Sequence, residues 1–206
     1  MKVLIFTLLF TAVVLPYVSY NFDRPLSPKQ TEVLISLSDI AFTKFVIVFI
    51  VNWATGNYSQ VDKLWSIMPG VYAWVTAYKG GLSERQLLMA GLVTLWGLRL
   101  TFNFARKGGY HWPPWAGEED YRWPVLRKNP LFANPIVWFL FNLFFISLYQ
   151  SYLIMGFTLP MVLTVEDNPA PLGPIDYLAT ALLLSFLALE TLADEQQWAF
   201  QQEKKR

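Results

Sequence analysis

The chain lacks cysteine entirely and has a single histidine, His111. The absence of cysteine excludes disulfides, thiolate metal sites and cysteine nucleophiles, and one histidine cannot build a zinc or haem site by itself. None of the eleven glycines forms a G-x-G-x-x-G or P-loop pattern, and no G-x-S-x-G elbow occurs. We therefore expect no metal centre, no Rossmann or P-loop domain and no serine hydrolase. Chemistry must come from carboxylates, tyrosines, arginines or a bound organic cofactor.

Charged residues are scarce as well, at 15% of the 206 residues, and the formal net charge is +1. This balance is unlike that of nucleic-acid-binding proteins, which carry strongly basic surfaces. By contrast, 54% of the residues are hydrophobic, 17% are aromatic and the mean hydropathy is +0.34. Several apolar runs approach the roughly 20 residues that a helix needs to cross a bilayer. The composition predicts an all-α, polytopic membrane protein with one domain over residues 1–206.

The apolar runs predict about six transmembrane helices. The first, residues 1–20, follows Lys2 and suits either an uncleaved anchor helix or a cleaved signal. The small residues that a cleavage site needs are poorly placed near Tyr20, which favours the anchor. The other five predicted spans cover residues 33–53, residues 65–78, residue 86 to just before Gly108, residues 134–156 and residues 174–193.

The basic residues predict the orientation, because lysine and arginine are enriched in cytosolic loops. With six spans, one side carries only Arg24, Lys29, Lys79 and Arg85. We therefore expect both termini and the long loop at 106–133 to lie in the cytosol with the richer side, which carries Lys2, Lys63, Arg106, Lys107, Arg122, Arg127, Lys128, Lys204, Lys205 and Arg206.

Polar residues recur along one face of the fourth predicted span. Trp96, Arg99, Asn103 and Arg106 follow helical spacing, so two guanidinium groups and an amide would line that face as it nears water. A cationic stripe at this depth is costly unless it is used. The pattern indicates a buried polar site.

Two carboxylates lie four residues apart on the last predicted span, Glu190 and Asp194. Asp194 is close enough to the boundary to belong simply to the polar face of a helix that leaves the membrane. Glu190 lies deeper, so it should be protonated or find a partner such as Arg99 or Lys44. Carboxylates near the cytosolic end of the last predicted span and an arginine near the same end of the fourth indicate a polar site that faces the cytosol.

The long loop is rich in aromatic residues among charged ones, including Tyr110, Trp112, Trp115 and Trp123. An aromatic belt at the lipid headgroups explains this composition without a ligand. A lid over a cofactor pocket explains it equally, and the sequence leaves both interpretations open.

Four ordered motifs over residues 57–196 resemble those of the steroid 5-alpha-reductase-like membrane proteins, in particular the branch often named for a domain of unknown function. The chain is also similar, more distantly, to the isoprenylcysteine carboxyl methyltransferases. The motifs are NYSQVDKLW at 57–65, LWGLRL at 95–100, EDYR at 119–122 and ETLADEQ at 190–196.

The resemblance implies a helical bundle in the endoplasmic reticulum or another internal membrane, which uses NADPH to reduce a carbon–carbon double bond in a steroid-like lipid. In the family, arginines face the cofactor phosphates and the acidic residues of the last motif face the nicotinamide or ribose. Mapped onto this chain, the resemblance implies cofactor contacts from Arg99, Asn103, Arg106, Asp120, Arg122 and Asp194, and catalytic roles for Tyr121 and Glu190.

Family members continue beyond the last motif into an Arg-His-Pro-Asn-Tyr type segment that contributes to cofactor binding, and this sequence stops at Arg206 before such a segment. We expect the 206-residue form either to bind NADPH through the remaining residues or to be inactive. Two other functions stay open: a methyltransferase that uses S-adenosylmethionine on a lipid or prenylated protein, and a non-catalytic protein that binds lipid or assists assembly.

Overall fold

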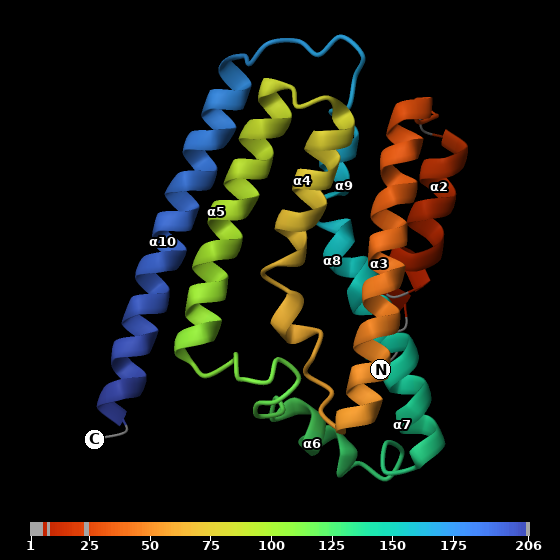
Figure 1. Cartoon of the computed structure of the whole chain (residues 1–206), viewed down its shortest axis with the longest axis vertical. Helices are drawn as coiled ribbons and strands as arrows, with labels where there is room; N and C mark the ends of the chain where they lie inside the picture. The colour runs from red at the N-terminus through yellow and green to blue at the C-terminus, as the bar shows by residue number, and fades with distance from the viewer. Residues whose placement is uncertain (1–5, 8, 23–24, 205–206) are drawn as a thin grey trace.

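The computed structural model describes residues 6–7, 9–22 and 25–204, and every regular element in these residues is helical. Figure 1 shows the long helices α3, α5 and α10 running side by side along the length of the molecule, with α4 between α5 and α3. In chain order the elements are η1 (Phe10–Val14), α2 (Leu15–Phe22), α3 (Pro28–Thr55), η2 (Asp62–Leu64), α4 (Met68–Gly80), α5 (Glu84–Arg106), α6 (Arg122–Arg127), α7 (Pro135–Phe141), η3 (Asn142–Tyr149), α8 (Gln150–Gly156), α9 (Leu159–Val162) and α10 (Pro174–Lys204).

Within the described residues, four helices are long and apolar enough to cross a membrane, where the sequence predicted about six. They are α3 with 28 residues, α5 with 23, the continuous helix α7–η3–α8 with 22, and α10 with 31. The helix within the predicted span at 65–78, α4, has 13 residues and is about 20 Å long, short of the ~30 Å hydrocarbon layer. Figure 1 shows the chain passing from the end of α3 through α4 to the opposite end of the molecule, where α5 begins, so this crossing stays a prediction. The predicted first helix lies partly outside the described residues, and its described part is helical through η1 and α2.

Local sequence signals set the ends of these helices. Ser27 and Ser83 each accept a backbone hydrogen bond from a glutamine three residues later, and each forms a full capping box at the start of α3 or α5. At the far ends of α3 and α4, Gly56 and Gly81 adopt left-handed backbone angles (φ 66° and 99°), which glycine takes without steric cost. These caps fix where each helix meets the polar connection that follows it.

The hydrophobic core lies between α3, α4 and the α7–η3–α8 helix. Leu37, Tyr72, Ile146 and Ile154 are fully buried there. A polar network joins α3 to η3 inside this core: the Asn52 Nδ2 donates to Asn142 Oδ1 at 3.0 Å, and Ser147 Oγ lies 3.3 Å from the same oxygen. Such contacts between membrane helices contribute roughly 1 kcal/mol each and fix the register of one helix against the other.

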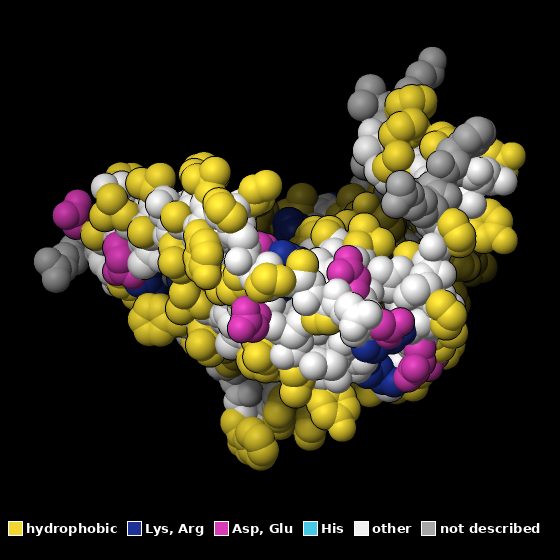
Figure 2. Space-filling model, turned by 90° about the horizontal axis from the view of Figure 1, so that it is seen from above, with side chains coloured by type: hydrophobic (Ala, Val, Ile, Leu, Met, Phe, Trp, Pro, Cys, Tyr) yellow, Lys and Arg dark blue, Asp and Glu magenta, His cyan; other side chains and the backbone are white. Residues whose placement is uncertain are grey.

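Helix α10 packs mainly on α5, and Leu187 is its buried residue. An ion pair joins the beginnings of the two helices, because Arg85 Nε and Nη2 lie 2.8 and 2.9 Å from the carboxylate oxygens of Asp176. Seen from this end of the molecule, Figure 2 shows charged side chains over the middle and right of the face, hydrophobic side chains along much of its rim, and further charged side chains at the left edge. That distribution suits an aqueous end above sides that contact lipid.

Candidate functional site

The opposite end of the α5–α10 pair holds the residues on which the sequence interpretation depended. Arg99 of α5 contacts both carboxylates of α10: its Nη1 lies 2.6 Å from Asp194 Oδ2, and its Nη2 lies 3.1 Å from Glu190 Oε2. Of the outcomes expected for Glu190, protonation or a partner such as Arg99 or Lys44, the structure shows the ion pair with Arg99. The Arg99 side chain is 16% exposed, and its Nε is buried without a hydrogen-bond partner among the described residues.

Arg106 extends the site toward the end of α5. Its Nη1 lies 2.5 Å from Glu195 Oε1, and its Nε donates to Asn103 Oδ1 at 2.7 Å. The guanidinium also lies over the ring of Trp198, 4.9 Å from its centroid. The structure thus gathers Arg99, Asn103, Arg106, Glu190, Asp194 and Glu195 into one group, which we call the α5–α10 cluster.

The α5–α10 cluster contains one more carboxylate than guanidinium groups. Two guanidinium groups face three carboxylates, so the cluster has a formal charge of −1 if all are ionised. Pairing of this kind makes charged groups tolerable near the membrane. It also means that the arginines reach an anionic ligand only by exchanging a carboxylate for it.

An apolar cavity of about 720 Å³ adjoins the cluster. It lies between α4, α5, α10 and the junction of α8 with α9, and its walls include Leu92, Trp96, Phe186 and Leu187. Glu190 is the one ionisable residue among the described residues that line it. A volume of this size, with an apolar wall and one polar end, is typical of sites for small apolar ligands.

Asp120 and Arg122, also predicted to contact the cofactor, lie elsewhere. Arg122 Nε is 2.7 Å from Asp120 Oδ1 and its Nη2 is 3.1 Å from Oδ2, while Asp62 Oδ1 is farther away, at 3.5 Å. The three residues line a second cavity of about 380 Å³, which shares no lining residue with the first. Their predicted contact with the cofactor stays a prediction.

Burial raises the pKa of both Asp62 and Asp120, and the charge of Arg122 lowers both, but the net result differs between the two carboxyl groups. Burial raises the pKa of Asp62 to about 6, and the nearby charge of Asp120 adds to this effect, while the charge of Arg122 opposes it. Burial acts in the same direction on Asp120, but the hydrogen bonds and charge of Arg122 outweigh it and lower the pKa of Asp120 below its usual value. Asp62 is therefore partly protonated near neutral pH, whereas Asp120 stays ionised.

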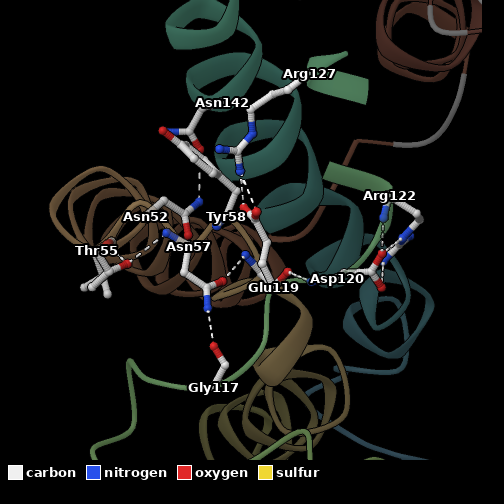
Figure 3. Close-up of polar contacts among 12 residues, drawn as sticks. Asn52, Thr55, Asn57, Tyr58, Gly117, Glu119, Asp120, Arg122, Arg127 and Asn142 are labelled. Atoms are coloured by element: carbon white, nitrogen blue, oxygen red, sulfur yellow. Dashed lines mark hydrogen bonds and ion pairs between the residues drawn. The ribbon is translucent and has the colours of Figure 1, made fainter. Parts of the chain in front are cut away.

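The polar loop that carries Asp120 is fixed to the segment after α3, as Figure 3 shows. Glu119 accepts hydrogen bonds from Arg127 and from the backbone N–H of Tyr58, and Asn57 Nδ2 donates to the Gly117 carbonyl at 2.9 Å. The Arg127 guanidinium lies 4.8 Å from the ring centroids of both Tyr58 and Trp138.

Lys63 also holds the loop that carries Asp120 in place. Its Nζ donates to the carbonyls of Pro114 at 2.9 Å and Ala116 at 2.6 Å. The loop contributes Asp120 and Arg122 to the lining of the second cavity, but its tyrosine and tryptophan side chains do not line it, so the aromatic belt and the lid over a cofactor pocket both stay open. Trp112, which is 89% exposed, is a residue of the loop that still suits an interfacial position.

Tyr121 is 75% exposed and lines neither cavity. Its predicted catalytic role stays a prediction. The sequence analysis did not select Asp62 or Gln150 as site residues, although both line the second cavity. Asp62 was already part of the NYSQVDKLW motif, but its burial depends on contact with residues about 60 positions later.

These features define a class of protein, an all-helical chain with four helices suited to a membrane and with polar side chains gathered beside an apolar cavity. The chain belongs to the family described as protein of unknown function DUF1295, whose model matches residues 48–206. All four motifs and both cavities fall within that range.

An uncharacterized protein of Schizosaccharomyces pombe is 38% identical over 154 residues. The alignment covers 71% of this chain and 42% of that relative, so the chain spans less than half of the relative's length. No solved structure matches the chain.

Proposed function

We propose that the protein is a membrane-embedded reductase that uses NADPH to reduce the conjugated double bond of a steroid-like or other lipid enone. The observation that carries this proposal is the junction between the apolar cavity of about 720 Å³ and the α5–α10 cluster at Glu190. An apolar substrate and a polar cofactor meet in such a reaction, so a site needs both surfaces side by side. The resemblance of the motifs to steroid 5-alpha-reductase-like proteins supports the same class of reaction.

The cluster fits the nicotinamide and ribose half of the cofactor. The Arg99 Nε has no hydrogen-bond partner among the described residues, although it is buried, and the carboxylates of Glu190 and Asp194 can accept from the amide and hydroxyl groups of the cofactor. The cofactor, when bound, supplies the hydride. Phosphate groups fit the cluster less well, because Arg99 and Arg106 are already paired with acids and would have to release them.

The chain's own residues then have distinct tasks. Arg99 orients the cofactor, and Asp194 holds the Arg99 guanidinium in place. The walls of the cavity exclude water from the double bond. Reduction of an enone adds hydride to the β carbon and a proton to the α carbon. Glu190 lines the cavity and its side chain is 52% exposed, so its carboxylate can take a proton from water on the exposed side and pass it to the α carbon.

We place the cluster on the cytosolic side of the endoplasmic reticulum or another internal membrane, where NADPH is accessible. The basic residues support this orientation, because Arg106, Arg122 and Arg127 lie near the same end of the molecule as the end of α10.

Calorimetry on the purified chain in nanodiscs, titrated separately with NADPH and with S-adenosylmethionine, tests the proposal. We expect saturable binding of NADPH that Arg99→Ala weakens at least about tenfold, whereas Arg85→Ala leaves it unchanged. Arg85 is the matched control, because it also joins α5 to α10 through a carboxylate but at the other end. Binding of S-adenosylmethionine instead would favour the methyltransferase, and binding of neither would favour a non-catalytic protein; either result would overturn the proposal.

A further inference from the structure

Besides Asp120 and Arg122, whose contact with the cofactor stays a prediction, the second cavity contains groups to which the proposed reductase gives no role. Its volume is about 380 Å³, and its lining combines the carboxylates of Asp62 and Asp120, the guanidinium of Arg122, the amide of Gln150 and the rings of Trp65 and Phe104. It shares no lining residue with the apolar cavity, so a ligand here is distinct from the lipid substrate.

The negative charge of Asp62 has no closely placed positive partner in this cavity, because Arg122 lies nearer to Asp120. Arg122 is held by both oxygens of Asp120, at 2.7 and 3.1 Å, and reaches Asp62 only at 3.5 Å, the outer limit of a hydrogen bond. The neighbouring Lys63 does not pair with Asp62, because its ammonium donates to the carbonyls of Pro114 and Ala116. With both carboxylates ionised, the cavity carries one negative charge that no described side chain neutralises.

The uncharged groups that line the cavity further restrict the class of ligand that it can bind. Gln150 is 8% exposed, and its Oε1 accepts the Trp65 indole N–H at 3.0 Å, which fixes the orientation of the amide. Its Nε2 makes no hydrogen bond within the described residues, so it offers a donor to a ligand oxygen. Carboxylates together with aromatic rings are the surroundings that bind organic cations. The volume is far larger than a bare metal ion needs, and the described residues form no metal-binding group of carboxylates and histidines.

We propose that this cavity binds an amino-alcohol group, with the ammonium against Asp62 and a neighbouring oxygen accepting from Gln150 Nε2. An ethanolamine lipid headgroup and a free amino alcohol share this chemistry. The cavity lies between the connection after α3 and the last turns of α5, so a headgroup at the membrane surface can reach it.

Ethanolammonium chloride, titrated into the purified full chain in a neutral detergent at constant ionic strength, is the probe. We expect saturable binding by calorimetry. We expect no binding of ethylene glycol, which lacks the ammonium, and weaker binding of ethylammonium, which lacks the oxygen. Asp62→Asn should weaken binding of ethanolammonium at least about tenfold, whereas Asp167→Asn should leave it unchanged, because Asp167 is an exposed carboxylate far along the chain.

A second arm distinguishes the two sources. If the ligand is a lipid headgroup, nanodiscs with phosphatidylethanolamine raise the thermal stability of the chain above that in phosphatidylglycerol nanodiscs, and Asp62→Asn removes the difference. If it is a free amino alcohol, only the soluble probe binds. Equal binding of ethylene glycol, equal binding by Asp62→Asn, or no binding in either arm would overturn the proposal. Binding of NADPH by the Asp62→Asn variant then shows whether the reductase proposal stands independently.

Discussion

Asp62 costs the protein stability in its ionised form. Its side chain is 16% exposed, and its Oδ2 and the Trp123 indole N–H are both buried without a hydrogen bond of normal geometry. A carboxyl group whose pKa is higher in the folded chain than in the unfolded chain favours folding when it is protonated. A residue that destabilises the fold at neutral pH is a residue to examine for function.

We predict that Asp62→Asn stabilises the protein at pH 7.5 and not at pH 3.5. The pKa of Asp62 is raised from 3.8 to about 6, so the cost of ionisation grows as the pH rises through this window and is absent below it. The shift corresponds to about 3 kcal/mol at most. Thermal unfolding of both proteins across this pH range measures the difference. Glu118→Gln, an exposed carboxylate in the same loop, is the control, and an equal response of the two variants would contradict the account.

Residue spacing predicted the α5–α10 cluster better than the second cavity. Arg99 and Asn103 share a face of one helix, and Glu190 and Asp194 share a face of another, so two periodic patterns were enough to anticipate that they meet. Asp62 and Arg122 belong to connections without periodicity. Their approach depends on how the loop folds back, which local sequence does not encode.

At the scale of elements, the close contact between α5 and the connection before α4 depends on Gly97. A methyl group at this position would lie 2.5 Å from the carbonyl oxygen of Ser66, and a backbone atom cannot move aside cheaply. Beside it, Thr101 Oγ1 donates to Ser66 Oγ at 2.7 Å. This contact positions the segment that carries Asp62 against α5.

We predict that Gly97→Ala lowers the stability of the protein by about 1–3 kcal/mol. Gly91→Ala on the same helix should be neutral or stabilise by up to about 1 kcal/mol, because a Cβ there meets nothing within 4 Å and alanine favours helix. Thermal unfolding in the same detergent compares the two. If Gly97→Ala were as stable as Gly91→Ala, the close packing of α5 on Ser66 would be wrong.

The element count shows what apolar composition alone cannot determine. The runs at α3, α5, α7–η3–α8 and α10 became long helices, as expected. The run at 65–78 has similar composition, but the turn at η2 and Pro69 delay the start of α4 and Gly81 ends it. Hydropathy averages over such breaks, so it did not show that the helix in this segment has only 13 residues.

For the whole molecule, the arrangement of helices predicts a topology that can be measured. Figure 1 places α6 and the end of α10 at one end of the molecule and the connection before α10 at the other. Because the chain has no cysteine, single cysteines can be introduced without interference.

We predict that Glu118→Cys reacts with a membrane-impermeant thiol reagent in sealed vesicles whose cytosolic face is outward. Asn168→Cys, in the exposed turn before α10, should react only after detergent is added. The physical reason is the excess of lysine and arginine at the Glu118 end. Labelling of both sites, or of Asn168→Cys alone, in intact vesicles would contradict the orientation.

The central claim is that the nicotinamide end of NADPH lies where the α5–α10 cluster meets the apolar cavity. Trp96 lines that cavity, whereas Trp112 is 89% exposed on the loop. The most direct test is energy transfer from tryptophan to the bound dihydronicotinamide, with NADPH affinity measured in parallel by calorimetry. The account predicts that Trp96→Phe removes a large part of the transfer at equal occupancy while Trp112→Phe leaves it unchanged. Unchanged transfer in Trp96→Phe would show that the cofactor binds elsewhere and would contradict the claim.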